Sequence, residues 1–148
     1  MMEKTTIFSD LDGVIAQNVE DAEIVLNSIN NIEKFFLNLK SIDDIYLLQK
    51  FLKENAKKII FSVITARPII LFDITKKWLN KNSIPFCSLY CCGSAEEKIN
   101  TVLKINPDFF IDDKKIIIEQ IKKRSTKTTS ILFESWRNTL KIISYHLR

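Results

Sequence analysis

The sequence has few of the residues that interrupt a chain, with only 2 glycines and 3 prolines among 148 residues. No stretch rich in either residue marks a flexible linker, so we expect a single domain over residues 1–148. Long apolar runs are also missing, because charges break each run before the roughly 20 residues that a membrane-spanning helix needs. The N-terminus, MMEKTTIFSD, lacks the apolar segment of a secretory signal. We therefore expect a cytoplasmic protein with no membrane partner.

Cysteine and histidine are scarce as well. Cys87, Cys91 and Cys92 are odd in number and share one apolar run, which is not the pattern of a disulfide framework. The single histidine, His146, is too far away in sequence to form a local zinc motif with them. We expect the three cysteines to be small buried residues of a strand with no functional role.

Charge is spread unevenly along the chain. Residues 1–50 carry a net charge of −5, whereas residues 51–148 carry +9. A basic half favours an anionic substrate. It includes a cluster of cations that we expect to be solvated surface rather than a nucleic-acid footprint: Lys114, Lys115, Lys122, Lys123, Arg124 and Lys127.

Apolar runs rich in Ile, Val and Phe predict strands that are buried on both faces. They lie at residues 5–11, 59–64, 86–92, 108–111 and 129–133. Helical patterns separate them, and strands that alternate with helices predict parallel pairing with right-handed crossovers. We therefore expect an α/β fold, a three-layer sandwich around a Rossmann-like, mostly parallel sheet of about five strands.

Several signals define the intervening helices. Ser41 is a candidate cap for a helix that runs to about residue 56, and Ser94 with Glu97 forms a capping box for a later one. Further helices are expected over 114–123 and 138–147. Another helix is expected between those that Ser41 and Ser94 would start, because one apolar stripe there has helical spacing: Leu71, Ile74, Thr75, Trp78 and Leu79.

Polar side chains follow the predicted strands where a parallel sheet binds its ligands, beyond the carboxyl ends. Four separated segments supply them: Asp10 and Asp12 after the first strand, Thr65 and Arg67 after the second, Lys98 about one turn into the helix after the third, and Asp112 and Asp113 at the end of the fourth. Acids, a hydroxyl and two cations are thus expected at one edge of the sheet.

This set of residue types points to phosphate chemistry. Carboxylates held a few ångströms apart repel one another, so a cation should lie among them. An all-oxygen ligand set without His or Cys suits a hard ion that keeps several waters, and Mg²⁺ is the natural choice. Thr65 and Lys98 could then orient phosphoryl oxygens, and an aspartate is a competent nucleophile toward phosphorus. For one motif alone, the alternative is that Asp12 and Gly13 simply form a turn.

The four segments resemble the signatures of the haloacid dehalogenase-like (HAD) superfamily of phosphatases: DLDGV, Thr65 in ITARP, Lys98 and IDD, in that order. The resemblance covers nearly the whole chain. It implies that Asp10 is the nucleophile and a Mg²⁺ ligand, and that Asp12 is the general acid/base whose backbone carbonyl also binds the metal. Dehalogenases of the superfamily lack the second aspartate and need no Mg²⁺, so Asp12 favours phosphate substrates.

The same resemblance implies the remaining roles. Thr65 and Lys98 would hold the transferring phosphoryl group, with Lys98 also offsetting the charge of Asp10. Asp112 would complete the metal site, directly or through water, with Asp113 sharing that work, and which of the two is the direct ligand stays open. Substrate contacts are expected from Gly13, Thr65, Ala66, Arg67 and Lys98.

Residues 14–40 are longer than a simple connection requires. Their helical stripe predicts one small flap or cap with an apolar inner face, although an ordinary crossover helix extended by a turn fits equally well. The stripe consists of Val25, Ile29, Ile32, Phe36 and Leu39. Either way the site has a small cap or none, so large substrates can enter it.

The expected function is that of a Mg²⁺-dependent phosphomonoesterase with an aspartyl-phosphate intermediate. Nucleotides are the first candidate substrates, because ITARP resembles the nucleotidase and polynucleotide-phosphatase branches, and sugar phosphates are the second. A small phosphorylated molecule is therefore the expected partner, with a nucleic-acid end as an alternative. Two other functions remain open: phosphate or nucleotide binding without hydrolysis in a regulatory protein, and phosphotransfer to an acceptor other than water. The oligomeric state and the purpose of the C-terminal helix are also open.

Overall fold

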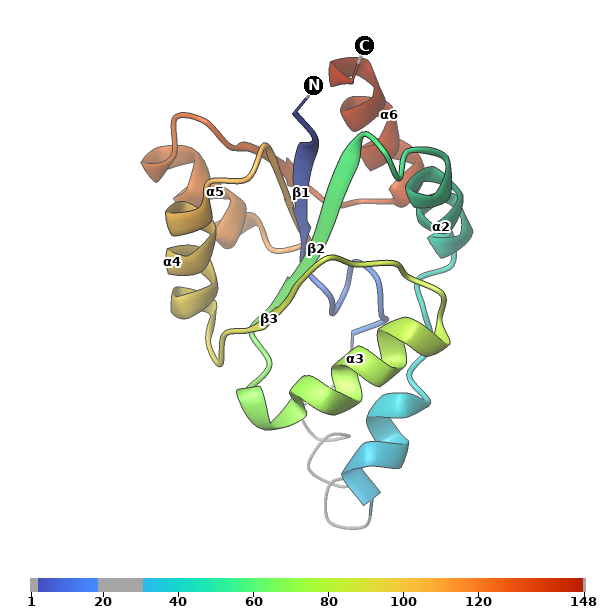
Figure 1. The fold of residues 1–148 in the computed structure, drawn as a ribbon. Helices are drawn as coiled ribbons and strands as arrows, with labels where there is room; N and C mark the ends of the chain where they lie inside the picture. Colours follow the sequence, from blue (N-terminus) through green and yellow to red (C-terminus); the bar gives the residue numbers. More distant parts are fainter. Residues whose placement is uncertain (1–2, 19–30, 148) are drawn as a thin grey trace.

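A parallel β-sheet forms the centre of the protein. The structure, a computed structural model, describes residues 3–18 and 31–147 (Figure 1). Its five strands have the order β3-β2-β1-β4-β5, and each neighbouring pair is parallel. This confirms the predicted α/β architecture and puts β1, which the two aspartates follow, in the middle of the sheet. The strands are β1 (Thr5–Ser9), β2 (Ile59–Thr65), β3 (Leu89–Cys91), β4 (Phe109–Asp112) and β5 (Thr129–Leu132).

Helices cover both faces of this sheet, which gives the three layers visible in Figure 1. The alternation of side chains along β1 explains them, since Ile7 enters one apolar core and Phe8 enters the other. Both faces of the strands are therefore apolar, as their continuous runs predicted. The Phe8 face packs against α4 (Ala95–Ile105) and α5 (Lys115–Arg124), and the Ile7 face against α2 (Ile45–Glu54), α3 (Phe72–Lys81) and α6 (Trp136–His146).

The predicted helix starts are right in one case and wrong in another. Ser94 caps α4, because its side chain accepts a hydrogen bond from the Glu97 N–H at 3.1 Å. Ser41 does not cap α2, which begins at Ile45 after Asp44 and has no side-chain cap. Ser41 instead forms an antiparallel bridge with Ala16, so the connection after β1 occupies its backbone.

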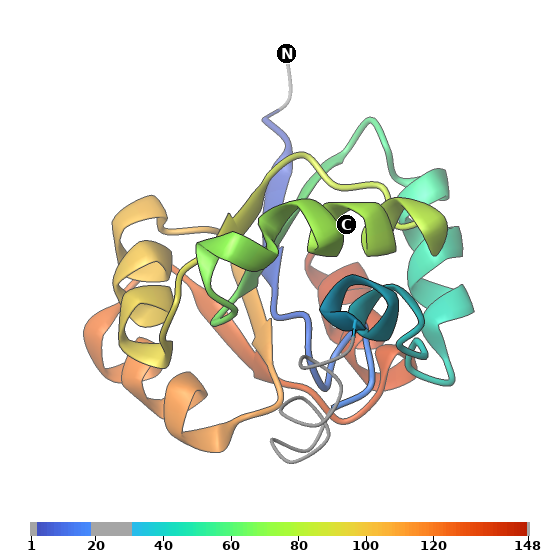
Figure 2. The ribbon, with the colours of Figure 1, turned by 90° about the horizontal axis from the view of Figure 1, so that it is seen from below.

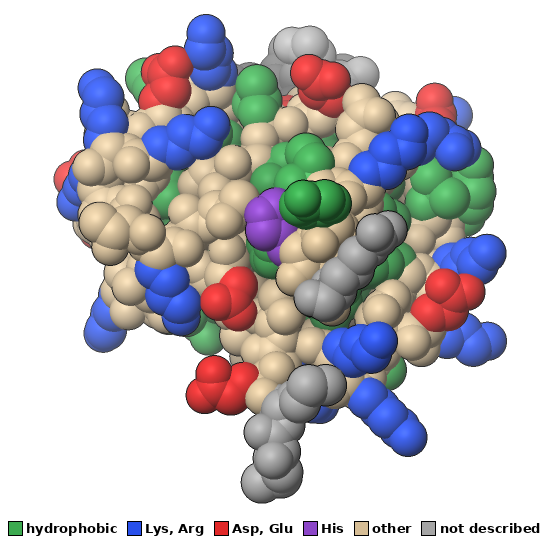
Figure 3. All heavy atoms as spheres, turned by 90° about the horizontal axis from the view of Figure 1, so that it is seen from above, with side chains coloured by type: hydrophobic (Ala, Val, Ile, Leu, Met, Phe, Trp, Pro, Cys, Tyr) green, Lys and Arg blue, Asp and Glu red, His purple; other side chains and the backbone are tan. Residues whose placement is uncertain are grey.

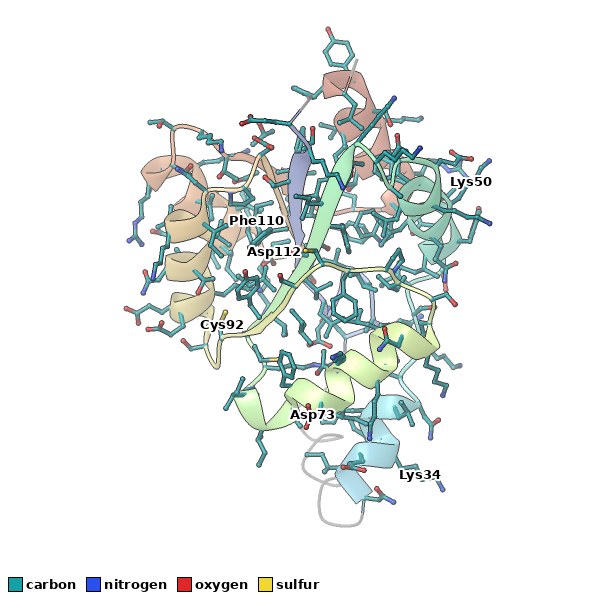
Figure 4. All side chains as sticks on the ribbon, viewed as in Figure 1. Lys34, Lys50, Asp73, Cys92, Phe110 and Asp112 are labelled. Carbon is teal, nitrogen blue, oxygen red and sulfur yellow. The ribbon has the colours of Figure 1, made fainter. Side chains whose placement is uncertain are left out.

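The third strand is shorter than predicted, and the expected burial of its cysteines is wrong. β3 spans only Leu89–Cys91 at an edge of the sheet, where one side of the strand has no partner strand. Cys87 is exposed, whereas Cys91 and Cys92 are half-buried, and all three are free thiols. Figure 4 shows Cys92 at the end of β3, beside the start of α4.

Part of the long connection after β1 lies outside the described residues, including Val25 and Ile29 of the predicted stripe. Residues 31–37 are helical, with Phe36 buried and Ile32 half-buried. Figure 2 views the carboxyl edge of the sheet and shows this helical segment beside α3. Trp78 in α3 donates a hydrogen bond to the Leu39 carbonyl at 2.9 Å, which ties the end of the connection to the fold.

The surface features agree with the composition. None of the described helices has the length and apolar composition needed to span a membrane. Every member of the cationic cluster, from Lys114 just before α5 to Lys127 after it, is exposed. His146 lies at the opposite end of the molecule from the carboxyl edge of the sheet, among apolar side chains (Figure 3).

Candidate active site

The carboxyl ends of β1, β2 and β4 bring the predicted polar residues to one edge of the sheet. β1 pairs with both other strands, so its end lies between theirs. Asp10 directly follows β1, and its N–H donates to the Ile111 carbonyl of β4 at 2.8 Å. Thr65 is the last residue of β2 and Asp112 is the last residue of β4, where Figure 4 shows it.

Lys98 reaches this edge from α4, as the sequence predicted. The Ser94 cap starts the helix next to the end of β3, so that Lys98 falls in the first turn and a half and points back toward the sheet. Its side chain is only 2% exposed. Lys98 Nζ lies 3.0 Å from Asp10 Oδ1 and 2.8 Å from Asp112 Oδ2, the second contact being ionic without hydrogen-bond alignment. One buried ammonium group thus bridges two buried carboxylates.

The pKa values of Asp10, Asp112 and Lys98 indicate an excess of negative charge around the lysine. Burial raises the pKa of Asp10 to about 8, against the opposing attraction of Lys98. Burial also raises the pKa of Asp112. For Lys98, burial acts to lower the pKa, but the charges of Asp10 and Asp112 outweigh it and raise the value. One cation does not neutralise the carboxylates around it, which therefore favour a further cation or a proton.

Asp113 completes a group that fits a divalent metal ion. One oxygen each from Asp10, Asp112 and Asp113 lies within 4.8 Å of the others. Asp113 Oδ1 is buried and has no hydrogen-bond partner among the described residues, while Asn18 Nδ2 donates to Oδ2 at 3.2 Å. A donor set made of carboxylate oxygens, with one oxygen left without a partner, suits Mg²⁺. The carboxylate of Asp12 is outside this group.

Gly13 packs directly against the acidic cluster, at Asp113. Its φ of +85° is one that side-chain-bearing residues rarely adopt, and a Cβ atom built there would lie 2.1 Å from Asp113 Oδ2. Only glycine lets the backbone turn so close to that carboxylate. The sequence predicted a substrate contact for Gly13, and the structure adds a packing requirement that the DG dipeptide could not reveal.

Asp12 and Arg67 form a two-pronged ion pair. Arg67 Nε donates to Asp12 Oδ2 at 3.0 Å, and Nη2 donates to Oδ1 at 2.7 Å. Arg67 Nη1 donates to Thr75 Oγ1 at 3.0 Å. The sequence predicted that Arg67 contacts substrate, and in the structure three of its five N–H groups donate to protein oxygens. Thr75 and Phe36, whose ring centroid lies 4.7 Å from Arg67 Cζ, were not predicted as site residues, because their positions on apolar stripes mark them only as core.

The remaining predicted residues belong to the loop after β2. Thr65 is 1% exposed, and its Oγ1 accepts a hydrogen bond from the Arg67 N–H at 3.1 Å. Ala66, between them, is half-buried. The Thr65 carbonyl accepts from the Cys92 N–H at 2.9 Å, which fixes the loop against the end of β3. All nine predicted site residues therefore lie on the segments that meet at this edge of the sheet.

No protein-family model matches the chain. A candidate nucleotidase from Oceanobacillus iheyensis is 33% identical to it over 66 residues, which are 43% of this chain and 35% of that protein. The match thus spans about a third of the relative's length.

Solved structures match nearly the whole fold. A hydrolase from Streptococcus pneumoniae TIGR4 has a TM-score of 0.61 at 13% identity, over 97% of this chain and 100% of that one. The HAD domain of the effector protein Lem4 from Legionella pneumophila has a TM-score of 0.58 at 15% identity, over 95% and 93% of the two chains. A chain of the Pnkp1/Rnl/Hen1 complex has a TM-score of 0.63 at 12% identity, over 90% of this chain and 47% of that one. The chain therefore has the fold of the HAD-superfamily hydrolases, which confirms, for the fold, the resemblance that its four motifs carry.

Proposed function

We propose that this protein is a Mg²⁺-dependent phosphomonoesterase that acts through an aspartyl phosphate on Asp10. The observation that supports it best is the buried bridge of Lys98 between Asp10 and Asp112, with Asp113 Oδ1 left without a partner beside it. A structural ion pair needs neither the third carboxylate nor its unpaired oxygen. A site that receives a divalent cation and a phosphate needs both the excess negative charge and the fixed lysine.

The reaction requires two displacements at phosphorus. In the first, an Asp10 oxygen forms a bond to phosphorus, the bond to the leaving oxygen breaks, and Asp12 gives that oxygen a proton. In the second, Asp12 takes a proton from water, the water oxygen bonds to phosphorus, and the Asp10–phosphorus bond breaks to release inorganic phosphate. Asp12 thus ends the cycle protonated, as it began, with a proton that comes from water.

The other residues hold the reacting groups in place. Thr65 and Lys98 bind phosphoryl oxygens, and Lys98 also keeps the Asp10 carboxylate oriented. Asp10, Asp112, Asp113 and the backbone carbonyl of Asp12 would hold Mg²⁺, which when bound neutralises charge on the phosphoryl oxygens. Residues 14–40 would act as a small flap over the single domain's open site.

Nucleotides are the substrates that we propose first. The partial match to a candidate nucleotidase supports this, and so does the ITARP segment at the site. The fold is also similar to part of an RNA repair complex, which makes the phosphorylated end of a nucleic acid the second choice. Hexose phosphates are the control class, because they carry the same phosphate without a base.

A phosphate-release panel tests this proposal. Nucleoside 5′-monophosphates, hexose phosphates and a short 5′- or 3′-phosphorylated oligonucleotide are assayed with Mg²⁺ and, as a control, with a chelator. We expect Mg²⁺-dependent release that is fastest from the nucleotides. Faster release from hexose phosphates would contradict the substrate assignment, and nucleotide binding without release would indicate the regulatory alternative.

A further inference from the structure

Every nitrogen of the Arg67 guanidinium group is committed to a neighbour within the protein. Two donate to the two oxygens of Asp12, at 3.0 and 2.7 Å, and the third donates to Thr75 Oγ1 at 3.0 Å. The Arg67 side chain is only 7% exposed. Paired N–H···O bonds of this kind fix the plane of a carboxylate as well as its position. Arg67 is therefore placed to orient Asp12, and three of its five N–H groups donate to protein oxygens.

Arg67 also connects three parts of the fold. It belongs to the loop after β2, whereas Thr75 lies in α3 and is fully buried. The face of the guanidinium group stacks on Phe36 of the helical segment 31–37, with Cζ 4.7 Å from the ring centroid. Phe36 is 3% exposed, so this stack is part of the packed interior. The orientation of Asp12 therefore depends on α3 and on the connection that follows β1.

Lysine could not replace arginine in this arrangement. An ammonium group is a point charge, without the planar fork that matches two carboxylate oxygens and without a flat face to stack on a ring. The Asp12 carboxylate is 32% exposed, so without the fork it can turn toward solvent. A change of Arg67 to lysine therefore keeps the positive charge but no longer fixes the orientation of the Asp12 carboxylate.

We propose that Arg67 is a positioning residue that holds the Asp12 carboxyl group in line with the leaving oxygen of the substrate. This inference rests on the proposed phosphomonoesterase function. When Asp12 is ionised, both of its oxygens accept hydrogen bonds from Arg67, as in this structure. When it is protonated, one oxygen keeps its bond to Arg67 and the other carries the proton that passes to the leaving oxygen. Arg67 thus decides how well the enzyme cleaves substrates whose leaving group needs that proton.

Two substrates of similar shape test this role. p-Nitrophenyl phosphate has a good leaving group, whereas phenyl phosphate has a poorer one that depends more on a general acid. We expect Arg67→Lys to lower kcat/KM for phenyl phosphate by about 10-fold or more and kcat/KM for p-nitrophenyl phosphate by less than about 3-fold, because kcat/KM reports the step in which the leaving group departs. Thr75→Val, which removes one acceptor of Arg67 at nearly constant volume, should give a smaller loss with the same preference.

A double variant and a surface control complete the experiment. In an Asp12→Asn background, Arg67→Lys should add no further loss with phenyl phosphate, because the group that it positions is gone. Arg124→Lys, an exposed change at the end of α5, should leave both rates as they are. Thermal melting of each variant shows that it is folded.

The results distinguish a failure of the positioning role of Arg67 from a failure of the proposed phosphomonoesterase function. Equal losses of kcat/KM on the two substrates, or a rise in KM with kcat unchanged, would overturn the positioning role and indicate a structural or substrate-binding arginine. Additive losses in the double variant would overturn it as well. No turnover of either substrate by the wild type would instead overturn the proposed function, and the role of Arg67 in that reaction with it.

Discussion

Lys98 Nζ lies 3.0 Å from Asp10 Oδ1, although 88 positions separate the two residues in the chain. The parallel topology creates this contact, because α4 begins at the carboxyl edge of the sheet after β3 and packs on the Phe8 face, next to β1. Lys98 is the one buried cation that we find beside the acidic cluster in the described part of the chain. Its removal leaves the buried carboxyl groups without a paired cation.

Lys98→Met therefore should destabilise the fold by about 3–5 kcal/mol, as expected when one partner of a buried ion pair is removed. Methionine nearly preserves the length of the side chain, so the loss reflects charge more than volume. Urea denaturation at neutral pH measures it. Lys50→Met is the matched control, since Lys50 pairs with Glu54 at 3.9 Å on the surface and should contribute less than about 1 kcal/mol. Equal effects of the two changes would contradict the importance of the buried bridge.

Asp10 should make the stability of the metal-free protein depend on pH. Burial raises its pKa from an ordinary 3.8 to about 8, so the folded protein keeps a proton that the unfolded chain releases between these values. The stability that this proton contributes is complete below about pH 4 and is lost as the pH rises through about 8. Asp10→Asn cannot titrate. In chelator, its free energy of unfolding should fall less between about pH 5 and 8 than that of the wild type.

Denaturation curves of the two proteins over this pH range provide the measurement. If the wild type and Asp10→Asn lose stability in parallel, Asp10 does not carry the proton that its burial indicates.

Mg²⁺ should bind the acidic cluster and raise the melting temperature. Ligands that bind only the folded state stabilise it by about 2.7 kcal/mol at a concentration 100 times their dissociation constant. Asp113→Asn should weaken this stabilisation, because Asp113 Oδ1 is a buried oxygen with no hydrogen-bond partner in the described part of the chain. Asp43→Asn removes an exposed carboxylate and serves as the control for net charge. The same Mg²⁺ shift in both variants would exclude Asp113 from the metal site.

Gly13 and Gly93 form a natural pair for testing the close approach to Asp113. They have nearly the same φ, +85° and +84°, but a Cβ on Gly13 would meet Asp113 Oδ2 whereas one on Gly93 would have nothing within 4 Å. Gly93→Ala should cost about 1–2 kcal/mol of backbone strain. Gly13→Ala should cost clearly more and should also weaken Mg²⁺ binding. Thermal melting with and without Mg²⁺ checks both effects, and indistinguishable variants would show that the contact with Asp113 is unimportant.

The fold was predictable from the sequence because its strands are buried on both faces. Their apolar runs are continuous, so residues such as Ile7 and Phe8 mark a strand of a covered parallel sheet. The topology of such a sheet then dictates that Asp10, Thr65 and Asp112 meet at one edge. The positions of the motifs after the predicted strands were therefore enough to predict which residues meet at the site.

Side-chain partners and edge effects were not predictable in the same way. The pairing of Arg67 with Asp12 depends on rotamers and on the register of α3, which places Thr75 under the guanidinium group. Cys87 is exposed because it precedes β3, which begins only at Leu89, and an apolar run does not show where within it the strand begins. Ser41 has the residue type of a helix cap, but its backbone pairs with Ala16 instead.

The most direct test of the central claim is release of p-nitrophenol from p-nitrophenyl phosphate by the wild type and by Asp10→Asn, each with Mg²⁺ and with chelator. The aryl leaving group needs little help from an acid, so the assay reports mainly on the nucleophile and the metal site. We predict turnover by the wild type that requires Mg²⁺ and is lost in Asp10→Asn, with the variant still folded. Turnover that survives in Asp10→Asn, or that is the same in chelator, would contradict a phosphatase mechanism based on Asp10 and Mg²⁺.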